Sequence, residues 1–468
     1  MAVKERQRHD IRRGLPMVRA VDPAALERER TELARLAREP MLRRWAGYWG
    51  RVGPGWLQSA ITLGGGTAGA SLFAGALLGY RLLWVQPVAM LLGIIMLSAI
   101  GYQTLVTRAR TFDAMRIYVH PAMAWAWALA ALAATLIWHF PQYALAGAVV
   151  QDMADLAGYS IPTWLVGAVI LPLATAITWS YGRGARGVRI YERLLRYMVW
   201  SIVIAFALVV IRTGVKDWGA LASGFFTFHV PRDPRGVSVM MAAFGAAVGI
   251  NMTFLYPYTL LARGWGAEHR PLARFDLVTG TFLPYVIATS LMVIATANTL
   301  PGAIDMPKTG IALPAKLAAQ ALAPIAGPVF GRVIFNLGLL GMVLSTITLH
   351  MLVSAFIVCE ICNWEPVGWR YRIGSLAVAP GVLGTVLWKN LLWLAVPASA
   401  ISGLLLPIAY IAFLVLHNRR AYLGEAKPKG RAAWLWNSGM GAAVIASAAS
   451  AAYFLYTVVP DYLARLAR

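Results

Sequence analysis

The stretch GPGWLQSAITLGGGTAGASLFAGALLGYRLLW (residues 53–84) decides the fold. Three consecutive glycines, Gly64, Gly65 and Gly66, interrupt a long apolar run. Each glycine disfavours a helix by about 1 kcal/mol relative to alanine. In lipid, backbone groups must find partners inside the protein, so irregular backbone persists only where it is buried or lines a cavity. We therefore predict a membrane helix that unwinds near its middle.

The whole composition supports a lipid environment. Of 468 residues, 59% are hydrophobic and only 13% are charged, whereas soluble domains carry about 25% charged residues. The net charge is +22, but the basic residues fall in short stretches between apolar runs. This pattern is typical of membrane loops and argues against a nucleic-acid groove. The two cysteines, Cys359 and Cys362, exclude a disulfide framework, and we expect no cofactor.

Apolar runs long enough to cross a bilayer recur along the chain. With the N-terminus in the cytosol, 31 of the 42 Lys and Arg residues fall on the cytosolic side. This asymmetry agrees with the positive-inside rule and places the C-terminus outside. The eleven predicted spans are 52–79, 82–106, 122–150, 161–181, 194–211, 237–262, 275–297, 330–358, 374–388, 391–417 and 433–458.

A second interruption is predicted in the sixth span. Its middle reads VGINMTFLYP, with Gly249, Asn251 and Pro257, so we expect a break near 249–256. Five spans in each half require the halves to enter the membrane from opposite sides, as inverted repeats of about 52–213 and 237–417. Broken helices at matching positions of two repeats point to a substrate site at the midplane.

The remaining segments form the ends of the molecule. Residues 1–51 are a basic cytosolic segment, in which 23–46 have the spacing of a surface helix; a partly disordered tail is the alternative. Residues 52–417 make a ten-helix core. A cytosolic loop, 418–432, leads to an eleventh helix and short tail, 433–468.

At the same residues the chain resembles the Nramp family of proton-coupled divalent-metal transporters, which have the LeuT-type fold. The resemblance includes GPGWLQ and GALLGYRLLW (within 53–84), YGRGARGVRIYERLLRYMVW (181–200), GAAVGINMTFLYPYTLLARG (245–264), ARFDLVTGTF (273–282) and GLLGMVLSTITLH (338–350). It covers about residues 50–420. The fold it implies is an all-α polytopic membrane protein with a 5+5 inverted repeat.

The chain departs from the family where the metal ligands lie. The family's Asp-Pro-Gly-Asn of the first span aligns with Gly64, Gly65, Gly66 and Thr67. Its Met-Pro-His of the sixth span aligns with Gly249, Ile250 and Asn251. The acidic proton relay expected in the third span is also absent.

These departures change the expected cargo. The remaining donors are backbone carbonyls and the neutral oxygens of Thr62, Thr67, Asn251 and Thr253, which favour Mg²⁺ or another hard cation over manganese or iron. Alternatively, the unwound glycine segment (Gly64, Gly65, Gly66) presents free N–H groups at a helix N-terminus, which would suit a small organic zwitterion or anion.

Polar residues within other spans are candidates for proton coupling. His139 and Gln142 flank a proline in the third span, and His350 lies in the eighth. Histidine titrates near neutral pH, and ionisable residues inside membranes are often functional. The alternative for each histidine is a structural hydrogen bond to a neighbouring carbonyl.

Taken together, these features predict a secondary transporter of the cytoplasmic membrane, with the lipid bilayer, a small solute or cation, and protons as partners. No metalloprotease or hydrolase motif occurs, which argues against an enzyme. A membrane sensor or subunit that binds a solute without transporting it is the remaining alternative.

Overall fold

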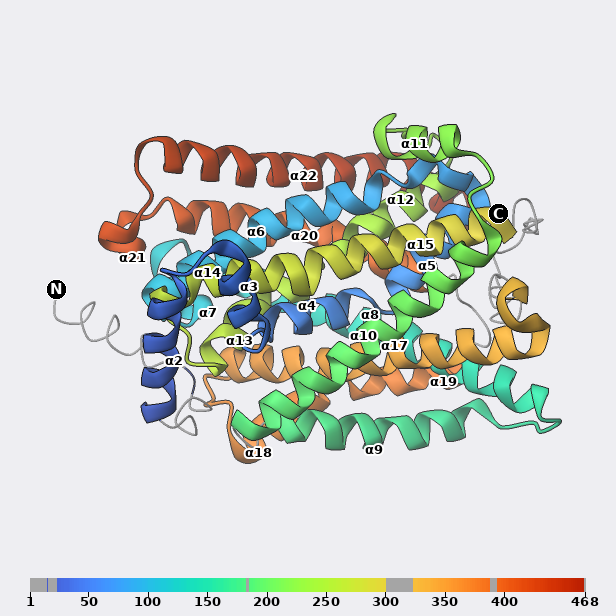
Figure 1. The fold of residues 1–468 in the computed structure, drawn as a ribbon, viewed down its shortest axis with the longest axis horizontal. Helices are drawn as coiled ribbons and strands as arrows, with labels where there is room; N and C mark the ends of the chain where they lie inside the picture. The colour runs from blue at the N-terminus through green and yellow to red at the C-terminus, as the bar shows by residue number, and fades with distance from the viewer. Residues whose placement is uncertain (1–14, 16–22, 182–184, 300–322, 388–393, 467–468) are drawn as a thin grey trace.

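The computed structural model describes residues 15, 23–181, 185–299, 323–387 and 394–466. Those residues form helices and connecting loops, with no strand among them. Long helices run side by side along the molecule (Figure 1). These are α6 (Val85–Thr107), α8 (Pro121–Leu156), α9 (Thr163–Tyr181), α10 (Ala185–Thr213), α15 (Leu283–Thr299), α17 (Ala323–Ile361), α20 (Ala395–His417) and α22 (Gly430–Leu466).

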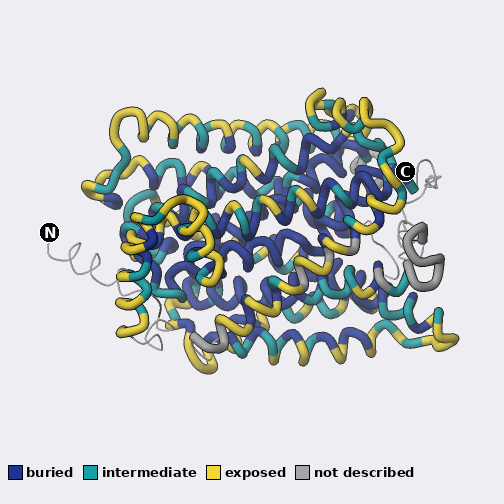
Figure 2. The backbone as a smooth tube through the Cα atoms, viewed as in Figure 1, coloured by how far each residue is buried: buried dark blue, intermediate teal, exposed yellow. Residues whose placement is uncertain are grey.

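Length and hydropathy identify the membrane-spanning helices. In the described part of the chain, eight helices can span a membrane, and a bent pair brings the number to nine. The two further predicted spans, 194–211 and 374–388, correspond to α10 and to part of residues 368–387, which are not among these nine. The count of eleven therefore stays a prediction. Figure 2 shows buried central helices and exposed faces on α22 and α9, which we take to face lipid.

The first span is broken as predicted. Helix α4 (Pro54–Thr62) ends at Leu63, and α5 (Gly65–Leu78) begins after Gly64 in extended conformation. The two halves are bent by 52°. All residues of α4 are buried, so the break lies inside the protein, where loosened backbone is tolerated.

The sixth span is also interrupted, over fewer residues than predicted. Helix α12 (Pro234–Ala247) and helix α13 (Ile250–Ala262) are separated by Val248 and Gly249, both extended. Pro257 lies inside α13, so the prediction that the break reaches 256 is wrong. A proline within a buried membrane helix is tolerated because neighbouring groups satisfy the freed carbonyl.

Two further spans depart from a regular α-helix. Between α14 (Arg270–Leu277) and α15 the chain forms a π-turn, η4 (Val278–Phe282), in which Gly280 lies against Trp56. The predicted span 374–388 consists of α18 (Gly368–Ser375), a 3₁₀ segment η6 (Leu376–Leu383) and α19 (Gly384–Leu387).

Short helices cover the two ends of the bundle. One end carries α2 (Pro23–Leu36) and α3 (Met41–Trp49), and the other carries α11 (Trp218–Phe226), as Figure 1 shows. The predicted N-terminal surface helix is therefore present in two pieces. The other short elements are η2 (Gly79–Leu82), α7 (Thr111–Tyr118), η3 (Ala267–His269), α21 (Arg420–Leu423) and η8 (Gly424–Ala426).

Candidate functional site

The two helix breaks contact each other at the centre of the bundle. The hydroxyl of Thr62, at the end of α4, lies 3.2 Å from the carbonyl oxygen of Ala247, at the end of α12. The same hydroxyl lies 3.1 Å from the sulfur of Met252, which is 3.4 Å from the backbone nitrogen of Gly249. A continuous set of polar contacts thus joins the end of α4 to the break between α12 and α13. This is expected where the broken helices of two inverted repeats meet.

Helix α8 supplies the partner for the start of α5. The N–H of Gly65 donates to Gln142 Oε1 at 3.0 Å, so this side chain caps the outgoing half-helix. The other amide atom, Gln142 Nε2, is buried and has no hydrogen-bond partner in the described part of the chain. Gln142 therefore links the first break to the interior and retains one donor for a further ligand.

Five buried side chains surround the breaks and form what we call the central polar cluster: Trp138, Gln142, Asn251, Ser399 and Ser402. Trp138 Nε1 donates to Ser399 Oγ at 2.9 Å. Among the residues that the structure describes, both amide atoms of Asn251 and the hydroxyl of Ser402 have no hydrogen-bond partner. A buried polar group without a partner is costly, so these atoms are the natural contacts for a bound solute.

The glycines are required by close packing on this cluster. A Cβ atom at Gly249 would lie 2.7 Å from Asn251 Oδ1 and 2.8 Å from Ser402 Oγ. A Cβ atom at Gly64 would collide with the hydroxyl of Thr346, and one at Gly66 with Ser399 and Trp138. Neighbouring side chains therefore fill the space that the family's ligands would need at these positions.

Two of the buried histidines, His139 and His350, form a pair. His139 Nδ1 lies 3.2 Å from His350 Nδ1, so one nitrogen carries a proton and the other accepts it. Neither Nε2 atom has a hydrogen-bond partner among the described residues. The His350 ring lies 5.6 Å from the Trp138 ring. The sequence indicated each histidine separately, whereas the fold places them together beside the central polar cluster.

Two predicted ligands use their hydroxyls locally. Thr67 donates to the carbonyl of Thr62. Thr253 donates to the carbonyl of Ile250 at 2.6 Å and accepts from Trp127 Nε1 at 2.9 Å. Both threonines are buried near the breaks, but their contacts support the backbone, and a role for them in binding stays a prediction.

Sequence reasoning missed several members of the site. Ser399 and Ser402 lie in the apolar helix α20, where a serine by itself signals nothing. The thioether of Met252 faces the break from one turn beyond Gly249, and only the folded backbone shows this. No group of three His, Cys, Asp or Glu residues that could hold a metal occurs in the described ranges.

A charged cluster closes the end of the bundle that carries α2 and α3. Asp276 accepts hydrogen bonds from the N–H groups of Gly53 (3.1 and 3.2 Å) and Gly55 (2.7 Å) at the start of α4. Arg263 pairs with Glu192 at 2.9 Å. Arg263 and Arg196 also donate to the carbonyl of Val52, each at 3.2 Å. We call this cluster the inner latch.

The other end is held by a second ion pair. Asp152, near the end of α8, accepts from Arg332 of α17 and from Asn336 Nδ2 at 2.7 Å. Three cavities on the described residues lie near α2 and α14, and none of these three is lined by the central polar cluster. An ion pair thus lies at each end of the bundle.

Comparison with known proteins agrees with the fold and the paired breaks. The family described as natural resistance-associated macrophage protein-like, Nramp, matches residues 55–457. The chain belongs to the Nramp family. Among curated proteins, this Nramp chain is 25% identical over 418 residues to the divalent metal cation transporter MntH of Burkholderia ambifaria, covering 86% of each chain. It is 24% identical to the MntH protein of Acidiphilium cryptum, covering 81% of this chain and 84% of that one.

Solved structures confirm the LeuT-type fold. A manganese transporter from Eremococcus coleocola aligns with a TM-score of 0.69 at 17% identity, covering 88% of this chain and 87% of that one. A nucleobase-cation-symport-1 family transporter with a bound hydantoin aligns with a TM-score of 0.55 at 14% identity, covering 87% and 93% of the two chains. The protein is thus a multi-pass membrane protein of a transporter family.

Proposed function

We propose that this Nramp-family chain is a secondary transporter that carries a hard cation, of which Mg²⁺ is the example, through a site between the two helix breaks. The curated relatives are named divalent metal cation transporters, which supports a cation as cargo. We further propose that the N-terminus lies in the cytosol and the C-terminus outside, in the cytoplasmic membrane, because most Lys and Arg residues then face the cytosol.

The observation that carries the proposal is the state of Asn251. This side chain is fully buried beside the second break, and neither amide atom has a partner within the described ranges of the chain. Ser402, which is also unpartnered, lies on the same side of Gly249. Oxygen atoms of both residues can contact a cation or a water molecule of its hydration shell.

The chemistry of the cluster supports a hard, partly hydrated cation. The cluster offers neutral oxygens and no carboxylate, and Mg²⁺ commonly retains several of its waters in protein sites. The thioether of Met252 lies against the Thr62 hydroxyl and the Gly249 nitrogen. In the family, a carboxylate at the position of Gly64 would contact a tightly bound transition metal. Here Thr346 occupies the space at Gly64, so no carboxylate takes its place.

A polar organic solute is the second candidate, and one observation favours it. The unpartnered atoms include donors, Gln142 Nε2 and Asn251 Nδ2, as well as the acceptor Asn251 Oδ1. Such a mixture suits a neutral or zwitterionic molecule. A carboxylate at the start of α5 would have to displace Gln142 from the Gly65 N–H.

We also propose that the histidine pair couples transport to protons. His139 and His350 share one Nδ1 hydrogen bond, so protonation of both imidazoles at Nδ1 would break that contact. The resulting repulsion would act on α8 and α17, which the pair joins beside the central polar cluster.

Uptake by proteoliposomes tests the proposal. Wild-type protein should give saturable Mg²⁺ uptake, and Asn251→Ala should abolish it. Thr289→Val is a matched control, since Thr289 is equally buried but bonds its own helix, at 2.8 Å from the Tyr285 carbonyl. Equal uptake by wild type and Asn251→Ala would refute the site.

The same preparation separates the alternatives. A thermal-shift screen with Mg²⁺, amino acids and organic acids identifies ligands that stabilise the folded protein. Stabilisation by an organic solute, followed by its uptake, would replace the cation with that solute. Binding without any uptake would instead assign the chain to the sensor class.

A further inference from the structure

A groove of about 800 Å³ lies between the surface helix α3 and helix α14, away from the central polar cluster. Its walls combine basic side chains at one end with apolar side chains at the other. The lining includes Arg44, Trp45, Arg270, Arg274, Val278 and Leu283. The groove is distinct from the central polar cluster and from the inner latch, and the proposed function does not require it.

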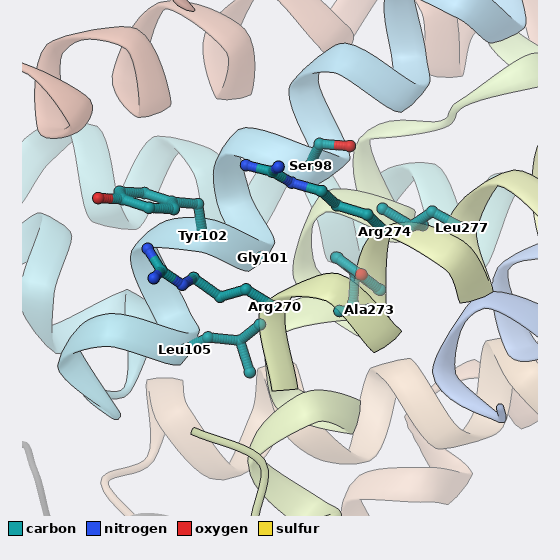
Figure 3. A pocket seen from close by; sticks show the side chains of 9 residues that line it. Ser98, Gly101, Tyr102, Leu105, Arg270, Ala273, Arg274 and Leu277 are labelled. Carbon is teal, nitrogen blue, oxygen red and sulfur yellow. The ribbon is translucent and has the colours of Figure 1, made fainter. Parts of the chain in front are cut away.

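Arg270 and Arg274 are the two exposed cations of this groove, one turn apart on α14. In the described part of the chain, neither has a carboxylate within ion-pair distance. Arg270 lies over the Tyr102 ring at 5.5 Å, and Arg274 over the Trp436 ring at 6.0 Å. Figure 3 shows a neighbouring pocket on the α6 side of α14, which shares these two arginines with the groove and towards which both guanidinium groups extend.

Stacking on aromatic rings leaves most of the donors free. A guanidinium over a ring uses its face, whereas its five N–H donors point outward in the plane. Of the donors of these two arginines, only Arg270 Nε forms a hydrogen bond within the described residues, to the carbonyl of Ala267 at 3.1 Å. The two side chains are therefore held in place with their donors available, which suits a phosphate group.

The one acid in the groove does not neutralise these cations. Glu268 pairs with Arg30 at 2.6 Å and with Arg108 at 3.2 Å. Arg44, on α3, adds a third basic side chain to the lining. The groove thus carries an excess of positive charge.

The apolar part of the groove points along the membrane-spanning direction. Val278 and Leu283 are 43% and 45% exposed and follow the arginines into the span. Helix α3 exposes Leu42 and Trp45. Trp45 also lines the groove, and its ring lies 6.1 Å from Phe275 of α14. An amphipathic helix with exposed Trp and Leu is typical of the membrane interface.

We propose that this groove binds an anionic phospholipid. The phosphate headgroup contacts Arg270 and Arg274, and the acyl chains lie along Val278 and Leu283. Basic pockets between helices at the cytosolic membrane surface recognise such headgroups. A lipid fits better than free phosphate because the apolar wall continues directly from the basic end.

Lipid titration followed by native mass spectrometry tests the site on the full-length protein. Phosphatidylglycerol should bind with preference over phosphatidylcholine. Arg270→Gln with Arg274→Gln should weaken that binding roughly thirtyfold, from the contribution of each basic side chain near an anionic surface. Arg420→Gln with Lys429→Gln, which removes the same charge from side chains 75% and 72% exposed, should change it less than about twofold.

Three results would overturn the proposal. The first is equal binding of the two lipids by the wild type. The second is an equal loss in the groove variant and the control variant. The third is displacement of the lipid by glycerol phosphate alone, which would assign the groove to a soluble phosphate compound. Arg270→Lys with Arg274→Lys retains the charge and should bind measurably, which separates misfolding from loss of the site.

Discussion

The inner latch allows one prediction to be worked through in detail. Asp276 is fully buried and holds the start of α4 through the N–H groups of Gly53 and Gly55. Asp276→Asn keeps the shape but removes the charge and one of the two acceptor oxygens. With its oxygen at the Oδ2 position the asparagine still accepts from both N–H groups, but both bonds lose the carboxylate charge, and the new NH₂ group faces the Gly53 nitrogen at the Oδ1 position.

The size of the effect follows from these contacts. A hydrogen bond to a charged group stabilises by about 1.5–3 kcal/mol. A hydrogen bond to a neutral group contributes about 1 kcal/mol less, so weakening both bonds costs about 2 kcal/mol and would shift the equilibrium between the closed and the released latch about thirtyfold towards release. The bend at residues 63–64 allows α4 to move without α5, so the release should be local.

Hydrogen exchange of the α4 amides measures this release. Exchange over residues 53–62 should become about thirtyfold faster in Asp276→Asn, with α17 unchanged. Asp217→Asn is the matched control, because Asp217 accepts one backbone bond, at 2.9 Å from Ala220, at the opposite end. Unchanged exchange of α4 in Asp276→Asn, or equal acceleration throughout the molecule, would refute the latch.

Two other substitutions test the ion pair between Arg332 and Asp152 and the packing at Gly64. Arg332→Gln leaves the buried Asp152 carboxylate without its cation and should destabilise the protein by about 3 kcal/mol. Arg116→Gln, which removes the cation of an exposed ion pair, should cost less than about 1 kcal/mol. Thermal unfolding of both variants measures the difference, and equal melting temperatures would contradict the account. Gly64→Asp should lower the melting temperature and restore no manganese binding, because Thr346 occupies the space at Gly64; tight manganese binding by this variant would show that the space is available.

The fold was largely predictable because its determinants are local. Three glycines in an apolar run disfavour a helix, and the first break lies at Leu63 and Gly64, whereas Gly65 and Gly66 begin α5. Gly249 marked the second break, but Pro257 misled the estimate of its length, since tertiary packing tolerates a proline in a buried helix. The 3₁₀ segment η6 could not be foreseen, because contacts such as that of Gly381 with His139 join residues far apart in the sequence.

The site was predictable only in outline. Glycines and Asn251 were indicated by alignment with the family, whereas Ser399 and Ser402 became visible only when α20 was placed beside the breaks. The contact between His139 and His350 joins residues 211 positions apart. Spacing along the chain carries no information on such a pair, nor on the rotamer that turns Met252 towards Gly249.

Calorimetric titration of the purified protein with Mg²⁺ and Mn²⁺ tests the central claim most directly. The claim is that the cargo binds between the two breaks through neutral groups, chiefly Asn251. We predict saturable Mg²⁺ binding that is lost in Asn251→Ala, with Mn²⁺ bound no more tightly than Mg²⁺. Micromolar Mn²⁺ binding that depends on Asn251, or Mg²⁺ binding indifferent to this residue, would contradict it.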